Sequence, residues 1–157
     1  MIILSRLADY GVILAAHLAA DPERQVNATV LAEETRLPRA TVAKVLKNLS
    51  HAGIVHAMRG AAGGYRLARN AQAISIADVV AAIDGDIEVA ECTASNSKTG
   101  KTGAHDCGRL DFCSARPHLR RISQAVSGAL AEVSLAEMVA PVPAMFLTLD
   151  LPEKRLP

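Results

Sequence analysis

Apolar residues recur at helical spacing through the first third of the chain and predict three consecutive helices, at residues 5–20, 28–35 and 39–52. The third helix has the clearest pattern, because its apolar residues fall at positions i, i+3, i+4 and i+7 and form one stripe. That stripe consists of Val42, Val45, Leu46 and Leu49. Asn27 is placed to cap the second helix, and Pro38 marks the break before the third.

Two short apolar segments, residues 54–58 and 65–67, follow the third helix and flank the glycine-rich stretch 59–64. This arrangement predicts a β-hairpin. Three helices followed by a hairpin is the element order of a winged helix-turn-helix, whose third helix enters the major groove of DNA. The expected fold class is therefore mainly α with a small β-hairpin.

The second half of the chain predicts a short helix and a long one. Ser75 and Asp78 have the spacing of a capping box, and the helix that they open ends at Asp84. The long helix runs from Pro117 to Ala140, with apolar residues at alternating three- and four-residue steps, as in a helix–helix seam. The seam residues are Leu119, Ile122, Val126, Ala129 and Val133.

These patterns divide the chain into five parts. They are a winged helix-turn-helix domain (1–70), a connecting helix (71–91), a cysteine-bearing loop (92–114), a long helix (115–140) and an irregular tail (141–157).

Composition supports a helical fold. Half of the 157 residues are hydrophobic, but only 3% are aromatic and none is tryptophan. Strands favour aromatic and β-branched residues, so this composition suits packed helices better than a sandwich or a barrel. The apolar stretches fall short of the roughly 20 residues of a membrane helix, and the N-terminus does not have the pattern of a secretory leader. We expect a cytoplasmic protein without a membrane partner.

The formal net charge of +1 hides a strong segregation of charge. Residues 36–69 contain seven Lys and Arg residues and no Asp or Glu, whereas residues 70–91 contain five acidic residues and no basic one. A positive field therefore covers the third helix and the hairpin, which are the parts of a winged helix that approach DNA phosphates. The alternative is a solvated basic helix beside an ordinary hairpin, and the helix order together with the absence of acids favours DNA binding.

The candidate DNA contacts lie on the third helix and the hairpin. Lys47 suits a phosphate, whereas other polar side chains of the third helix suit base edges or phosphates, and Arg59 at the hairpin tip suits a minor groove. Gly60 and the two glycines that follow are expected to permit a tight turn with positive φ. The full set is Arg39, Thr41, Lys44, Lys47, Asn48, Arg59, Gly60, Tyr65 and Arg66.

Three segments carry a resemblance to a known family. Residues 59–68, Arg-Gly-Ala-Ala-Gly-Gly-Tyr-Arg-Leu-Ala, closely resemble the wing of the Rrf2 family of bacterial transcription regulators, which includes IscR, NsrR and RirA. Residues 4–11, Leu-Ser-Arg-Leu-Ala-Asp-Tyr-Gly, look like the first helix of that family. Residues 41–47, Thr-Val-Ala-Lys-Val-Leu-Lys, look like the recognition helix of its branch associated with SUF iron–sulfur assembly. The resemblance covers about residues 1 to 140.

The resemblance implies a homodimer of two winged helices joined by the long helix, which acts as a dimerisation helix. Each subunit would read half of a partly palindromic double-stranded DNA operator. The resemblance also implies that the three cysteines ligate an iron–sulfur cluster. A 2Fe–2S cluster is slightly favoured over 4Fe–4S.

The cysteines are Cys92, Cys107 and Cys113, with 14 and then five residues between them. Thiolates suit iron–sulfur clusters or zinc, but structural zinc more often uses a close Cys-x-x-Cys pair, which this chain lacks. The gap between the first two cysteines is longer than in many family members. Three thiolates leave one ligand position open. Asp9 is slightly favoured for it, because it matches a position where some relatives supply a carboxylate from the partner subunit, and His105 and His118 are the alternatives.

The sequence therefore predicts a DNA-binding transcriptional regulator, a repressor of iron–sulfur assembly genes. It would sense cluster status, redox state or nitric oxide through the Cys-ligated cluster. One alternative is a winged-helix regulator with a structural zinc ion or with no metal. Another is a thiol-dependent enzyme that uses His105 and Cys107, but no oxyanion arrangement is evident, and we expect that the chain is not an enzyme.

Overall fold

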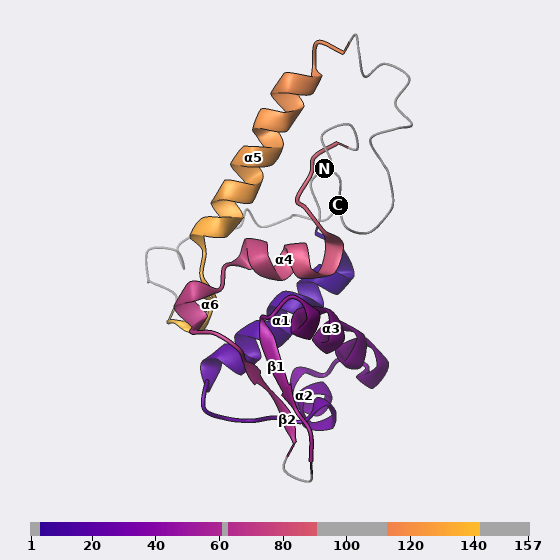
Figure 1. Ribbon diagram of the computed structural model, residues 1–157, viewed down its shortest axis with the longest axis vertical. Helices are drawn as coiled ribbons and strands as arrows, with labels where there is room; N and C mark the ends of the chain where they lie inside the picture. The colour runs from indigo at the N-terminus through magenta and orange to yellow at the C-terminus, as the bar shows by residue number, and fades with distance from the viewer. Residues whose placement is uncertain (1–3, 61–62, 91–112, 142–157) are drawn as a thin grey trace, which may run out of the picture.

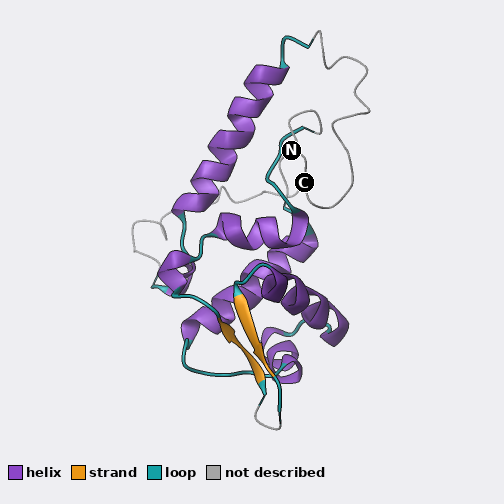
Figure 2. Cartoon of the chain, viewed as in Figure 1, coloured by secondary structure: helices purple, strands orange, loops and turns teal. Residues whose placement is uncertain are grey.

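A computed structural model describes residues 4–60, 63–90 and 113–141 and gives a mainly helical fold with one antiparallel hairpin, as predicted (Figures 1 and 2). The elements are α1 (Arg6–Ala20), α2 (Ala28–Thr35), α3 (Arg39–His51), β1 (Val55–Met58), β2 (Gly64–Leu67), the 3-10 turn η1 (Ala71–Ala73), α4 (Ile76–Asp84), α5 (Arg116–Glu132) and α6 (Leu135–Val139).

The ends of the first three helices follow from local side-chain chemistry. Ser5 caps α1 by accepting a hydrogen bond from the backbone N–H of Ala8, and the Asn27 side chain caps α2 in the same way. Pro38 occupies the N-cap of α3 and provides no side-chain hydrogen bond there. Gly53 ends the turn after α3 with a φ of +69°, which a glycine adopts without strain.

The hairpin is held by two sets of backbone contacts. Within it, β1 and β2 pair in a register that runs from Val55 opposite Leu67 to Met58 opposite Gly64. Outside it, the backbone of Tyr65 exchanges hydrogen bonds of 2.7 and 3.1 Å with Val26, in the connection between α1 and α2. The wing is therefore attached to the helical body by its second strand.

The glycines of the wing differ from expectation. Only Gly60 among the three has a positive φ, of +120°. Gly63 and Gly64 are required for space instead, because a Cβ atom at Gly63 would lie 2.5 Å from the Met58 carbonyl oxygen. At Gly64 it would lie 2.8 Å from the Val26 carbonyl carbon and oxygen.

One apolar core lies under α1, α3 and α4 and extends to the base of the hairpin. The apolar stripe of α3 is completely buried in it, as the helical spacing predicted. The backbones of α1 and α4 approach closely at Gly11, where a Cβ atom would meet the side chain of Ile83 at 3.1 Å. Helix α3 packs against both of these closely joined helices.

The long helix predicted for residues 115–140 is in fact two helices, because α5 ends at Glu132 and α6 begins at Leu135. Ser134 causes the break, since its side chain and the Glu137 carboxylate form a capping box. Backbone bonds from Ile76 N–H to the Val133 carbonyl and from Leu135 N–H to the Ile74 carbonyl, both 2.9 Å, hold the break against the start of α4. Leu135 is fully buried, so α6 belongs to the body while α5 projects from it (Figure 1).

Helix α5 leaves an apolar side chain exposed. Ile122 of the predicted seam is 45% exposed. Val133, the last residue of the predicted seam, is 37% exposed but lies just past the end of α5, where the backbone is extended. On another side of α5, the buried hydroxyl of Ser123 accepts a hydrogen bond from the backbone N–H of Val89, which attaches the helix to the segment after α4. None of the described helices is long and apolar enough to cross a membrane.

Candidate nucleic-acid interface

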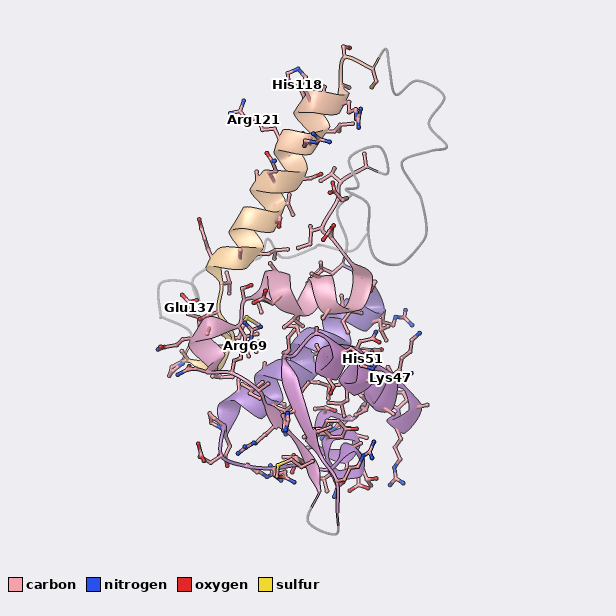
Figure 3. The ribbon with its side chains drawn as sticks, viewed as in Figure 1. Lys47, His51, Arg69, His118, Arg121 and Glu137 are labelled. Carbon is pink, nitrogen blue, oxygen red and sulfur yellow. The ribbon has the colours of Figure 1, made fainter. Side chains whose placement is uncertain are left out.

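The outer face of α3 carries the predicted polar side chains. Lys44 and Lys47 are exposed, and Thr41 and Asn48 are half-buried beside the apolar stripe. Figure 3 shows Lys47 on α3, away from the hairpin and the body. These four candidate residues therefore lie on one helix, and the opposite face of that helix is buried in the core.

Arg39 is the first residue of α3 and its side chain is 68% exposed. Its guanidinium does not stand alone, because Nη2 lies 2.9 Å from Oε1 of Glu33 on α2. Sequence reasoning placed Arg39 among the DNA contacts and missed this partner. The six-residue separation of the two residues spans the turn between α2 and α3, so no single-helix spacing rule reveals the pair.

The wing supplies the remaining candidates. Arg59 and Gly60 are exposed at the tip, and Arg66 is exposed on β2. Tyr65 is half-buried, and its ring packs against the core. It therefore supports the wing from beneath, whereas Arg66 faces outward.

His56 is a further candidate that sequence reasoning missed. It is exposed on β1 and pairs directly with Arg66 in the hairpin register, so both side chains lie on the same face of the wing. The signal available in the sequence was strand alternation, because residues directly opposite each other in an antiparallel pair share a face.

The base of the helix-turn-helix is fixed by a cluster of charge at Glu34. Its carboxylate accepts hydrogen bonds from Arg24 at 2.7 and 3.2 Å, and lies 2.7 Å from Nε2 of His17 on α1. The hydrogen bond from Arg24, followed by that from His17, lowers the pKa of Glu34 below its ordinary value. The cluster joins α2 to α1 and leaves the recognition helix free on the other side.

The predicted cluster ligands are only partly described. Cys113 is half-buried and free of a disulfide, and its carbonyl accepts a hydrogen bond from the N–H of Arg116 at the start of α5. Asp9 is exposed on the first turn of α1, and His118 is exposed on α5 (Figure 3). Cys92, Cys107 and His105 lie outside the described residues. Within the described ranges, no three His, Cys, Asp or Glu side chains form a group that could hold a metal ion.

A basic third helix packed on a helical core and followed by a basic hairpin is the arrangement of winged-helix DNA-binding proteins. A family model described as "Rrf2: Iron-dependent Transcriptional regulator" matches residues 4–141. The chain therefore belongs to the Rrf2 family of transcriptional regulators. This confirms the predicted family, and it confirms that the chain is a regulator and not an enzyme.

Several known proteins are similar over most of the chain. The HTH-type transcriptional repressor NsrR of Streptomyces coelicolor is 27% identical over 139 residues, which cover 87% of this chain and 88% of that protein. The structure of CymR, the global cysteine regulator of B. subtilis, has a TM-score of 0.66 and 24% identity over 88% of this chain and 97% of that one. The structure of T. potens IscR has a TM-score of 0.66 and 22% identity over 92% and 96%. The two structures show that the fold is shared.

Proposed function

We propose that the chain is a homodimeric repressor of iron–sulfur assembly genes that acts on a partly palindromic DNA operator in the cytoplasm. The single observation that carries the DNA-binding part is the cluster of basic side chains on α3 and the wing of an Rrf2-family chain, in a stretch of sequence (36–69) that contains no Asp or Glu. The assignment to assembly genes rests on the likeness of residues 41–47 to the recognition helix of the SUF-associated branch.

In the proposed complex, α3 enters the major groove and the wing lies over the adjacent minor groove. Arg39, Thr41, Lys44 and Asn48 face base edges or the phosphates beside them, and Lys47 binds a phosphate. At the wing, the Arg59 guanidinium enters the minor groove, Gly60 permits the close turn, and Arg66 adds a phosphate contact. Tyr65 supports this surface through its packing against the core.

We propose dimerisation through α5. Its exposed apolar residue Ile122 lies on the predicted seam, which would pack against the same helix of a second copy. A two-fold axis at that seam would place two recognition helices on two operator half-sites, whose spacing the dimer sets.

We propose that Cys92, Cys107 and Cys113 hold an iron–sulfur cluster, 2Fe–2S ahead of 4Fe–4S, with Asp9 as the fourth ligand. Three thiolates are a donor set that suits such a cluster. When bound, the cluster would supply a coloured, redox-active centre that responds to oxidant, iron loss or nitric oxide. Cys113 lies three residues before the first residue of α5, so loading the site would act directly on the start of the proposed dimerisation helix.

The DNA-binding part is tested with a duplex enriched from a random pool by the wild-type protein. We expect Lys44→Ala and Arg59→Ala to weaken binding by about fivefold or more, and the loss of a phosphate contact to lower the salt slope by about one. The control is Arg121→Ala, on α5 at the far end of the molecule, which should leave affinity unchanged (Figure 3). Unchanged binding by both test variants would show that the DNA surface lies elsewhere.

The cofactor part is tested by anaerobic purification followed by absorption and EPR spectroscopy and by iron, sulfide and zinc analysis. We expect a brown protein, and we expect Cys92→Ser, Cys107→Ser and Cys113→Ser to lose the chromophore without unfolding the winged helix. A colourless protein with stoichiometric zinc would establish a structural zinc site instead. A metal-free protein whose DNA binding ignores Cys107→Ser would leave a winged-helix regulator without a cluster.

A further inference from the structure

Two adjacent glutamates at the end of α2 form ion pairs on opposite sides of the helix. Glu34 faces α1 and is engaged by Arg24 and His17, whereas Glu33 faces α3 and is paired with Arg39. The turn between the helices fixes this arrangement, because Arg36 has a φ of +56° and its N–H bonds the Glu33 carbonyl at 3.3 Å. Glu33 is therefore held beside the first residue of the recognition helix.

The Arg39–Glu33 ion pair differs from the surroundings of the other basic residues on α3 and the wing. Within the ranges that the structure describes, Arg39 is the only candidate DNA-contacting cation that forms an ion pair with a carboxylate. Its side chain and that of Glu33 are 68% and 63% exposed, so the pair adds little to stability. Its effect is instead on Arg39, because the carboxylate offsets the positive charge of the guanidinium and orients it.

Glu33 uses only part of the guanidinium. The contact joins a single nitrogen, Nη2, to one carboxylate oxygen at 2.9 Å. A guanidinium carries five N–H donors in one plane, so most of the donor edge of Arg39 is still available. The pair is electrically near neutral, yet it still presents hydrogen-bond donors, and the contact with Glu33 favours one direction for them.

A neutral, oriented donor distinguishes between two kinds of DNA contact. A lone guanidinium is attracted to every phosphate, which adds affinity without sequence information. A guanine edge offers two acceptors, O6 and N7, in the plane that a guanidinium fits, and this match depends on direction as much as on charge. A carboxylate beside the arginine weakens its attraction to phosphates and preserves its hydrogen bonds to a guanine edge.

We propose that Glu33 is a specificity-determining residue that directs Arg39 away from phosphates and toward a guanine edge in the major groove. The inference rests on the proposed DNA-binding function. Arg39 reads the base, and Glu33 acts through Arg39 as a positioning residue. The position is suitable, since the first turn of a recognition helix is where helix-turn-helix proteins contact base edges.

The test compares a random-sequence duplex with the duplex enriched by the wild-type protein. We expect Glu33→Gln to tighten binding to the random duplex by about two- to fivefold, the value of an exposed ion pair, and to steepen its salt slope. The same change should leave binding to the enriched duplex equal or weaker, so the ratio of the two affinities falls. Glu132→Gln removes the same charge from exposed α5 and should leave this ratio unchanged.

A double-mutant cycle shows whether Glu33 acts through Arg39. In an Arg39→Ala background, Glu33→Gln should have no effect on either duplex. Arg39→Lys keeps the charge without the planar donor edge, so it should retain binding to the random duplex and lose preference for the enriched one. Replacing each guanine of the enriched duplex by 7-deazaguanine should weaken wild-type binding about tenfold at one position, and that loss should vanish in Arg39→Ala.

The outcomes separate the two hypotheses. An equal gain by Glu33→Gln on both duplexes, or the same gain in the Arg39→Ala background, would show a general charge effect and overturn the proposal. If the wild-type protein enriches no duplex at all, the proposed DNA-binding function fails instead. Thermal unfolding of each variant checks that these exposed substitutions leave the fold intact.

Discussion

At the scale of single residues, the spacing between backbones explains the glycines of the wing. Gly64 begins β2 at the point where this strand crosses the connection between α1 and α2. A Cβ atom there would lie 2.8 Å from both the carbonyl carbon and the carbonyl oxygen of Val26. Since neither contact is with a flexible side chain, a larger residue must displace the strand, and Gly64 therefore sets how the wing joins the body.

Gly64→Ala should lower the free energy of unfolding by about 1–3 kcal/mol, as expected for overpacking at a rigid site. The matched control is Gly128→Ala in the exposed middle of α5, where no atom lies within 4 Å of an added Cβ. That control should raise stability by about 0.5–1 kcal/mol through better helix propensity. Chemical denaturation measures both changes, and an unaffected Gly64→Ala protein would contradict the close approach.

At the scale of elements, sequence patterns predicted what local interactions decide. The predicted caps at Asn27 and Ser75 and the buried stripe of α3 follow from residues within a few positions of each other. The break before α6 was not predicted, although Ser134 and Glu137 have the spacing of a capping box, and backbone bonds to the start of α4 hold the break in place.

The candidate interface shows the same division between local and long-range interactions. Its basic residues could be predicted because charge is visible along the chain, and the structure places them on α3 and the wing. The Glu33 partner of Arg39 could not be predicted, since the contact crosses the turn between α2 and α3, and the position of His56 opposite Arg66 depends on the strand register. The cysteine pattern was visible too, but Cys113 is its only described member.

The contact between α1 and α2 should depend on pH through Glu34. Its pKa is lowered in the folded protein by hydrogen bonds from Arg24 and His17, so the ionised carboxylate favours the folded state. This stabilisation is fully present above the ordinary glutamate pKa of 4.5 and is lost as the pH falls through the lowered value. The stability difference between wild type and Glu34→Gln should therefore shrink on acidification.

Urea denaturation of both proteins at a series of pH values between neutral and about 3 measures that difference. Glu132→Gln, which removes an exposed carboxylate from α5, is the control and should show no such trend. A difference between wild type and Glu34→Gln that stays constant with pH would mean that the cluster contributes nothing to the folded state.

At the scale of the whole molecule, the wing and the start of α5 lie at opposite ends (Figure 1). The hairpin lies toward one end of the long axis, and the start of α5, three residues after Cys113, lies toward the other (Figure 1). The body between them joins α1 to α4 and α6 through the buried core. In the proposed mechanism, a signal at Cys113 reaches the operator most directly through the relative placement of two subunits, which makes α5 the decisive element.

Ile122→Glu tests this role of α5. The side chain is 45% exposed on the predicted seam, so a carboxylate there places like charges together at a two-fold axis. We expect the wild type to sediment as a dimer and the variant as a monomer, with about 100-fold weaker binding to the enriched palindromic duplex, because the second half-site no longer adds avidity. Binding to an isolated half-site should be unchanged.

Gln124→Glu adds the same charge on the side of α5 that faces α4, and it should remain a dimer. A dimeric Ile122→Glu protein, or a monomeric wild type, would show that the two recognition helices are not joined by this seam.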